Sequence, residues 1–227
     1  MTQLIIFDWD DVFSKGSTEG YYKCYHAAVI GVGVHLSGDE EKARIAAKWG
    51  SSHVEEIQEL LKEHPELVDE ACRIYEENLF GDTFVDCISV IGGGKELLER
   101  LAQTYTLALA TGVHPKVLRE KIMPKFNISP DLFAHIITAY DLDDPNLAKP
   151  HAHIAETIMR HEGIARENTI MVGDSRNDVG MARNSGIEPV VVLSGHLNRE
   201  EAEALDVRYI IDDVSALESV LETLNVN

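Results

Sequence analysis

The sequence has few cysteines, few basic residues and no long apolar run. Its three cysteines, Cys24, Cys72 and Cys87, are odd in number and widely spaced, which excludes a disulfide framework or a cysteine-based metal site and favours reduced thiols in the cytoplasm. The chain has only 20 Lys and Arg against 39 Asp and Glu, which gives a net charge of −19. Because nucleic acids and anionic membranes bind basic surfaces, we expect neither as a partner. The longest apolar stretches, such as residues 189–193, are far shorter than the ~20 residues of a membrane span. An acidic residue among the first eight, with no basic region before it, predicts no secretory signal.

The overall composition is that of a globular protein. Hydrophobic residues make up 44% of the 227 residues and charged residues 26%, a balance that excludes disorder and collagen-like repeats. A chain of this length can bury roughly 70% of the surface that it exposes when unfolded, so it needs no covalent staple to fold. The length fits one large domain or two modest ones.

Short apolar runs alternate with amphipathic segments over most of the chain. The pattern predicts strands at residues 3–7, 105–110, 134–138, 169–172, 189–193 and 209–211. It predicts helices at residues 94–102, 115–121, 151–161, 178–184, 199–204 and 214–224. Strands that alternate with helices are typical of βαβ units around a parallel sheet, so the expected fold class is α/β.

The pattern between residues 14 and 86 is helical, and we find no good strand there. Ser37 and Ser52 are each followed three residues later by glutamate, the capping-box pattern that precedes a helix. Pro65 suits the first turn of a third helix. The first strand can join the parallel sheet only if this helical block is an insertion after it. We therefore expect a core of residues 1–13 and 87–227 and a helical domain of residues 14–86.

Polar side chains follow four of the predicted strands. Open α/β sheets bind ligands beyond the carboxyl ends of their strands, so these positions are candidates for a site. The first strand ends in Asp8 and Asp10, which point to the same side because they are two residues apart in an extended segment. The other strand ends contribute Thr111 and Gly112, Lys149, and Asp174 and Asp178.

This set of charges needs a compensating partner. Carboxylates near one point repel one another by about 4 kcal/mol per pair at 4 Å and an effective dielectric constant of 20. Lys149 alone cannot neutralise four of them, so either some are protonated or a cation binds. Oxygen ligands with room for water suit Mg²⁺. An aspartate beside Mg²⁺ and a lysine can attack an electrophilic phosphorus, and a second acid can protonate the leaving alkoxide.

With these segments in this order, the chain resembles the haloacid dehalogenase superfamily, in the branch with a helical cap inserted after the first strand. The matching segments are IIFDWD ending at Asp10, ATG ending at Gly112, AKP around Lys149, and VGDSRND ending at Asp178. The resemblance covers nearly the whole chain. It implies a Rossmann-like three-layer sandwich around a central parallel sheet, with residues 14–86 as an all-helical cap domain. Phosphoglycolate phosphatase-like and β-phosphoglucomutase-like proteins belong to this branch.

The resemblance also implies a nucleophile and a set of metal ligands. Asp8 would form an aspartyl-phosphate, and Asp10 would act as general acid and base. Mg²⁺ would be held by Asp8, by the backbone carbonyl of Asp10 and by Asp174. Asp178 would bind the metal through water or orient Asp174.

The remaining motif residues would bind phosphate, and one position departs from the family pattern. Thr111 and the backbone amide of Gly112 would hold phosphate oxygens, and Lys149 would bridge the nucleophile and the phosphate. The family usually has glycine directly after the second aspartate, where this chain has Asp11. Aspartate is among the few residues that tolerate the positive φ that glycine allows, so we expect the turn to be kept.

These features predict a Mg²⁺-dependent phosphatase that hydrolyses the phosphomonoester of a small cytosolic metabolite, as a monomer or a homodimer. A phosphotransferase or sugar-phosphate mutase would share every core residue and remains an alternative. A haloacid dehalogenase proper needs neither Mg²⁺ nor the second aspartate, so Asp10 argues against it. A receiver-type signalling module is a further alternative, but such modules are about half this length. A catalytically impaired, ligand-binding member is suggested only by Asp11.

Overall fold

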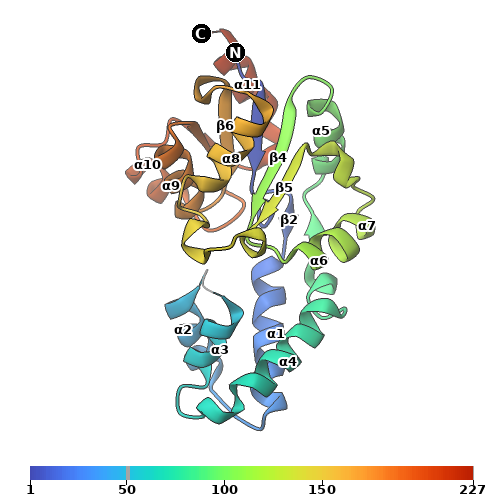
Figure 1. Cartoon of the computed structure of the whole chain (residues 1–227), viewed down its shortest axis with the longest axis vertical. Helices are drawn as coiled ribbons and strands as arrows, with labels where there is room; N and C mark the ends of the chain where they lie inside the picture. The colour runs from blue at the N-terminus through green and yellow to red at the C-terminus, as the bar shows by residue number, and fades with distance from the viewer. Residues whose placement is uncertain (50–51, 227) are drawn as a thin grey trace. The chain divides into compact units, whose positions relative to one another are not determined.

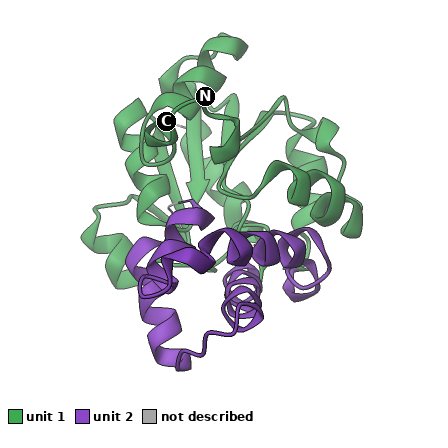
Figure 2. Ribbon diagram, turned by 60° about the horizontal axis from the view of Figure 1, so that its bottom comes forward, with its two compact units in different colours: residues 1–15, 89–227 green, residues 16–88 purple. Residues whose placement is uncertain are grey.

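A computed structural model describes residues 1–49 and 52–226, which form two compact units (Figure 2). The core unit comprises residues 1–15 and 89–227, and the helical unit comprises residues 16–88. The segments that link the units pair with each other, since β2 (Ser14–Lys15) runs antiparallel to β3 (Ser89–Val90). The sequence pattern did not predict a strand at Ser14. This short pairing keeps both links within the core unit, so the boundaries lie two residues beyond those expected.

The core unit is built on one six-stranded sheet in which all neighbouring strands are parallel (Figure 1). The strand order across the sheet is β5-β4-β1-β6-β7-β8. The strands are β1 (Leu4–Phe7), β4 (Thr106–Thr111), β5 (His135–Thr138), β6 (Thr169–Gly173), β7 (Glu188–Val192) and β8 (Tyr209–Ile211). Each strand predicted from the sequence is present, with its ends shifted by one residue at most. The predicted α/β class with a central parallel sheet is confirmed.

The burial of the central strand, β1, indicates that the sheet is covered by helices on both faces. All four of its residues are fully buried, although successive side chains of a strand point to opposite faces. Leu4 and Ile6 pack in one cluster with residues of α8 (His153–Glu162) and α9 (Arg176–Ser185). A continuous apolar run of this kind is typical of a parallel strand with helices on both sides.

The other helices of the core unit follow the strands in alternation. They are α5 (Gly94–Leu101), α10 (Arg199–Ala204) and α11 (Leu217–Val226). The segment predicted as one helix at 115–121 is instead composite. It runs through α6 (Pro115–Val117), a π-helical segment (Leu118–Ile122) and α7 (Met123–Lys125). Pro124 lacks a backbone N–H, so it interrupts the regular hydrogen-bond pattern at this point.

The helical unit contains four α-helices among its described residues. They are α1 (Ser17–Gly31), α2 (Gly38–Lys48), α3 (His53–Leu60) and α4 (Val68–Phe80). Ser52 and Glu55 form the predicted capping box at the start of α3. Ser37 accepts a hydrogen bond from the backbone of Glu40, which is half of the box predicted for α2. Across the described residues of both units, no helix combines the length and apolarity needed to cross a membrane.

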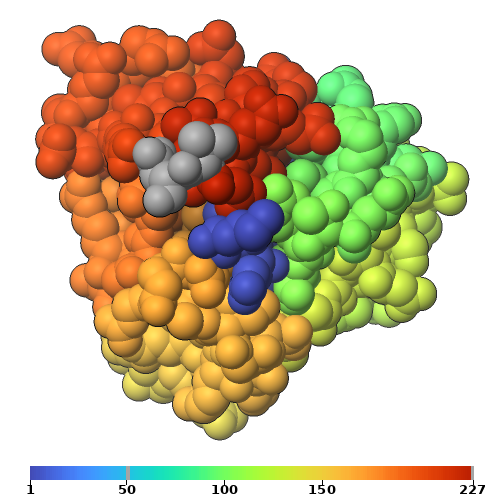
Figure 3. Space-filling model, turned by 90° about the horizontal axis from the view of Figure 1, so that it is seen from above, coloured from blue at the N-terminus to red at the C-terminus, as the bar shows by residue number. Residues whose placement is uncertain are grey.

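The first residues of the chain lie beside α11 on the surface in Figure 3. The backbone N–H of Thr2 donates to Asn225 Oδ1 (2.7 Å), and the side-chain amide of Asn225 donates to the hydroxyl of Tyr105 (3.2 Å). These contacts mark the amino ends of the parallel strands. The carboxyl ends, where α/β sheets bind ligands, therefore lie at the opposite edge of the sheet.

Candidate active site

Asp8 lies at the carboxyl edge of the sheet, directly after the central strand. Its backbone N–H donates to the carbonyl of Val172 (2.9 Å), which extends the pairing of β1 with β6 by one residue. Asp174 follows the end of β6 on one side of β1, and Thr111 ends β4 on the other side. Three adjacent strands therefore present polar side chains at one edge, as the sequence predicts.

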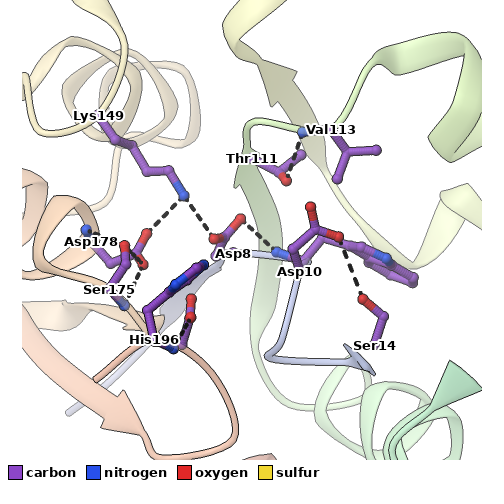
Figure 4. Close-up of polar contacts among 11 residues, drawn as sticks. Asp8, Asp10, Ser14, Thr111, Val113, Lys149, Ser175, Asp178 and His196 are labelled. Carbon is purple, nitrogen blue, oxygen red and sulfur yellow. Dashed lines mark hydrogen bonds and ion pairs between the residues drawn. The ribbon is translucent and has the colours of Figure 1, made fainter. Parts of the chain in front are cut away.

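Lys149 joins two of these carboxylates. Its Nζ lies 3.0 Å from Asp8 Oδ2 and 2.7 Å from Asp178 Oδ1, and Figure 4 shows the amino group between the two. The side chains of Lys149 and Asp8 are 12% and 11% exposed, and that of Asp178 is 2% exposed. The second oxygen of Asp8 accepts the backbone N–H of Trp9 (2.7 Å). Both oxygens of Asp8 are thus oriented by fixed donors.

The start of α9 positions Asp178. Ser175 is the residue before this helix, and its hydroxyl and backbone N–H both donate to Asp178 Oδ2, at 2.6 and 3.1 Å. The other oxygen of Asp178, Oδ1, accepts a hydrogen bond from Lys149 Nζ. A Cβ at Gly173 would collide with the Asp178 carboxylate, so a glycine at that position allows the close approach. This capping box places a carboxylate deep at the sheet edge instead of in solvent.

The loop after β7 encloses Asp174. The backbone N–H of His196 donates to Asp174 Oδ2 (2.8 Å), and that of Leu197 donates to the Asp174 carbonyl (2.9 Å). A Cβ at Gly195 would overlap the Asp174 carboxylate, so only glycine permits the loop to pass this close. Asp174 is 2% exposed as a result.

The electrostatics of the cluster show an excess of negative charge. Burial, followed by the charges of Asp178 and Asp8, raises the pKa of Asp174 to about 8. Burial also raises the pKa of Asp8, although Lys149 opposes that shift. Burial acts to lower the pKa of Lys149, but the charges of Asp178 and Asp8 outweigh it and raise that pKa overall. One lysine therefore does not balance the buried carboxylates.

Two groups of side chains among the described residues converge closely enough to hold a metal ion. Carboxylate oxygens of Asp8, Asp174 and Asp178 lie within 4.8 Å of one another. Oxygens of Asp11 and Asp174 and a ring nitrogen of His196 do the same. The first group matches three of the four predicted metal-binding residues, and its all-oxygen donors are those that Mg²⁺ prefers.

The carboxylate of Asp10 belongs to neither group, contrary to the expectation that four carboxylates share one point. Asp10 Oδ1 accepts a hydrogen bond from the hydroxyl of Ser14 (3.5 Å), and Figure 4 shows this side chain directed away from Lys149. The reason is that β1 ends at Phe7 and Asp10 lies in a turn, so the extended geometry assumed for residues 8–10 is not kept. A metal contact through the backbone carbonyl of Asp10 stays a prediction.

Thr111 and Gly112 lie at the end of β4. Thr111 is 1% exposed, and its hydroxyl oxygen accepts the backbone N–H of Val113 (3.2 Å). That contact leaves the hydroxyl proton available for donation, since a hydroxyl has one donor and two acceptor positions. Gly112 is exposed at the strand end.

Asp11 has the left-handed backbone conformation expected for this position. Its φ is 55°, in the left-handed region that glycine adopts readily, so the turn expected at this position is kept. The hydroxyl of Ser194, in the loop after β7, donates a hydrogen bond to the Asp11 carbonyl. The turn after β1 and the loop after β7 are therefore tied together.

The sequence interpretation missed Ser175, Gly195 and His196. Ser175 carried a readable signal, because serine with an acid three residues later is a capping pattern. Gly195 and His196 carried none, since a glycine and a histidine in a loop are usually unremarkable. Only the fold brings this loop against Asp174.

Comparison with known proteins identifies the family. The model of haloacid dehalogenase-like hydrolases matches residues 2–186. The chain belongs to this hydrolase family. The match includes every predicted motif of the site, from the residues after β1 to the start of α9.

Curated relatives of this hydrolase carry the names of phosphatases, pyrophosphatases and a 5′-nucleotidase. A 5′-nucleotidase from Pseudomonas aeruginosa is 31% identical over 139 residues, which is 59% of each chain. A phosphoglycolate phosphatase from Vibrio parahaemolyticus is 27% identical over 128 residues, covering 56% of this chain and 54% of that one. The chain spans about half the length of the curated relatives it matches.

Solved structures match the fold over nearly the full length of the hydrolase. A predicted phosphoglycolate phosphatase from Haemophilus somnus has a TM-score of 0.81 at 20% identity, with 97% of this chain and 98% of that chain covered. A hydrolase from Pseudomonas syringae has a TM-score of 0.75 at 20% identity, with 98% and 99% covered. These likenesses confirm the Rossmann-like fold predicted from the sequence.

Proposed function

We propose that this hydrolase is a Mg²⁺-dependent phosphatase that cleaves the phosphomonoester of a small metabolite through an aspartyl-phosphate on Asp8. The observation that carries the proposal is the setting of Asp8, with Lys149 Nζ at 3.0 Å and two further carboxylates within 4.8 Å. Phosphatase names among the relatives support the reaction class. A small phosphorylated metabolite is the proposed substrate, and the cytoplasmic location expected from the cysteines stays a prediction.

The donor set fits Mg²⁺. Asp8, Asp174 and Asp178 supply converging carboxylate oxygens, and the raised pKa of Asp174 reflects a buried negative charge that a cation would stabilise. These three residues, with the backbone carbonyl of Asp10, would hold the ion. When bound, Mg²⁺ would offset the charges of the cluster and of the phosphate, so that an anionic carboxylate can approach an anionic substrate.

The residues of the chain would divide the reaction between them. Asp8 attacks phosphorus, with its carboxylate oriented by Trp9 and Lys149. Lys149 neutralises phosphate charge as the bond to Asp8 forms. Asp10 protonates the leaving oxygen and then takes a proton from the water that hydrolyses the acyl phosphate. Asp178 holds Lys149 in place through the 2.7 Å contact.

Thr111 and Gly112 would bind the transferred phosphate. The Thr111 hydroxyl accepts from Val113 and can therefore donate its own proton to a phosphate oxygen. The exposed backbone amide of Gly112 would supply a second donor. The helical unit is proposed as the cap that selects the substrate, as the family resemblance implies.

The test is release of phosphate from para-nitrophenyl phosphate and from a panel of phosphorylated metabolites. Wild-type enzyme should require Mg²⁺ and stop in EDTA. Asp8→Asn should lower kcat by at least about a thousandfold, because it removes the nucleophile. Asp206→Asn is the control, since it makes the same substitution at an exposed aspartate outside the site. Turnover by Asp8→Asn close to that of the control would refute the proposal, and isomerisation without phosphate release would favour the mutase alternative.

A further inference from the structure

The second converging group, Asp11, Asp174 and His196, is not explained by the proposed reaction. It combines two carboxylates with an imidazole, whose ligand atoms all lie within 4.8 Å of one another. Asp11 and His196 come from different segments, the turn after β1 and the loop after β7. His196 is outside the motifs through which the chain resembles its family, and Asp11 replaces the glycine that the family usually has at that position. We propose that these three residues form a second metal site, specific for a divalent transition-metal ion such as Co²⁺ or Zn²⁺, with Asp174 shared between the two sites.

Hydrogen bonds and a close backbone approach hold together the segments that carry the three side chains. The Ser194 hydroxyl donates to the Asp11 carbonyl, and the His196 backbone N–H donates to Asp174 Oδ2. The close approach at Gly195 brings the loop against Asp174. The loop after β7 is thereby fixed to both acidic residues, so the position of His196 is set by the fold.

Asp174 supplies a buried ligand that points into the group. It is 2% exposed, and the hydrogen bond from His196 goes to Oδ2. Within residues 1–49 and 52–226, the Asp174 side chain has no other hydrogen bond or ion pair. The nearby Lys149 forms its ion pairs with Asp8 and Asp178. A buried carboxylate oxygen without a hydrogen-bond donor is stabilised by a cation.

The size and chemistry of the group fit a transition-metal ion. Two ligands bonded to one ion at about 2.1 Å are at most about 4.2 Å apart, so small side-chain movements bring atoms within 4.8 Å onto one ion. Imidazole nitrogen suits later transition-metal ions such as Zn²⁺ and Co²⁺, whereas Mg²⁺ prefers oxygen ligands only. His196 therefore distinguishes this site from the group formed by Asp8, Asp174 and Asp178.

Figure 4 shows where His196 lies relative to Asp8. In Figure 4 His196 lies on the same side of Asp8 as Asp178 and Ser175, and Asp10 and Thr111 lie on the other side. Asp174 is common to both converging groups, as a carboxylate that bridges two ions would be. The proposal shares Asp174 with the proposed function but does not require phosphatase activity, because it concerns binding of the ion alone.

Equilibrium dialysis against Co²⁺ in the absence of substrate tests the proposal. Wild-type protein should bind two Co²⁺ per chain, and His196→Gln should bind one. Asp11→Asn, a second variant that keeps the shape of the side chain, should weaken binding of the second ion by at least about tenfold. His35→Gln is the matched control, because His35 is an exposed histidine of the helical unit. Circular dichroism melting of each variant establishes that it is folded.

Each result decides the matter. Two ions in wild type and in His35→Gln, with one in His196→Gln, support the site. Two ions in both wild type and His196→Gln, or one ion in wild type, overturn it. Loss of an ion in His35→Gln as well as in His196→Gln also overturns it, since binding would then be adventitious. Asp8→Asn separates the two proposals, because it should weaken the all-carboxylate site and leave the ion at His196 bound.

Discussion

Asp11 illustrates how a single backbone angle limits the choice of residue. Its φ of 55° costs a residue with a side chain roughly 1–2 kcal/mol, less for aspartate than for a β-branched residue. Glycine would remove that cost, but it would also raise the entropy of the unfolded chain. The sequence alone predicted that aspartate keeps the turn, because the family pattern locates the position. It could not predict that the carboxylate would lie near His196, which depends on a loop nearly two hundred residues away.

Substitutions at Asp11 should separate the backbone effect from the charge effect. Asp11→Val should lower the free energy of unfolding by about 1–2 kcal/mol, since a β-branched residue is strained at positive φ. Asp11→Gly should stabilise the protein in EDTA at about pH 8, because it removes both the strain and one carboxylate beside Asp174. Urea denaturation gives both values.

Asp206 provides the reference for these measurements. Its φ is 53°, and it is exposed, so its glycine and valine variants report the backbone effect alone. We expect Asp11→Gly to be more stabilising than Asp206→Gly by about 1 kcal/mol. Equal values at the two positions would mean that the Asp11 carboxylate has no electrostatic effect on the cluster.

At the scale of elements, the strands were predictable and the details of the site were not. The apolar runs that became β1, β4 and β6 locate Asp8, Thr111 and Asp174 at strand ends, because parallel strands share one carboxyl edge. The start of α9 was predicted two residues late, since Arg176 and Asn177 do not contribute to the apolar pattern and only the capping interaction of Ser175 locates it. The direction of the Asp10 side chain depends on the turn after β1, which strand geometry does not describe.

The capping box of α9 should matter for activity as well as for stability. Ser175→Ala removes the helix cap and the 2.6 Å hydrogen bond to Asp178, so it should cost about 1 kcal/mol of stability. It should also lower kcat about tenfold, because Asp178 then holds Lys149 less precisely. Thermal melts and steady-state kinetics measure the two effects.

Asn198→Ala is the matched control for this change. Asn198 and Glu201 form the same kind of capping box at the start of α10. This variant should lose a similar amount of stability and keep the wild-type kcat. If both variants lower kcat to the same extent, the role of Ser175 in positioning Asp178 is wrong.

At the scale of the whole molecule, stability should depend jointly on pH and on divalent cation. Burial beside Asp178 and Asp8 raises the pKa of Asp174 from its ordinary 3.8 to about 8. Between these values the folded protein holds a proton that the unfolded chain releases. Without cation, this group therefore makes the free energy of unfolding fall as pH rises, by up to about 1.4 kcal/mol per pH unit. Mg²⁺ displaces that proton, so its stabilising effect should grow with pH.

Thermal melts in EDTA and in Mg²⁺, at about pH 5 and about pH 8, measure this linkage. The increase in melting temperature on adding Mg²⁺ should be larger at the higher pH in wild type. Asp174→Asn should lose most of the increase and its pH dependence, because the titrating carboxylate is absent. A Mg²⁺ effect of equal size at both pH values would contradict the assignment of Asp174 as a ligand.

The central claim is that Asp8 becomes covalently phosphorylated, and chemical trapping of that intermediate tests it most directly. Enzyme mixed with Mg²⁺ and para-nitrophenyl phosphate is quenched in acid during turnover, and borohydride then reduces any acyl phosphate to homoserine. Mass spectrometry of the tryptic peptide of residues 1–15 locates the modified residue. We predict homoserine at position 8 in wild type and none in Asp8→Asn. Rapid turnover with an unmodified Asp8, or modification at another residue, would contradict the account.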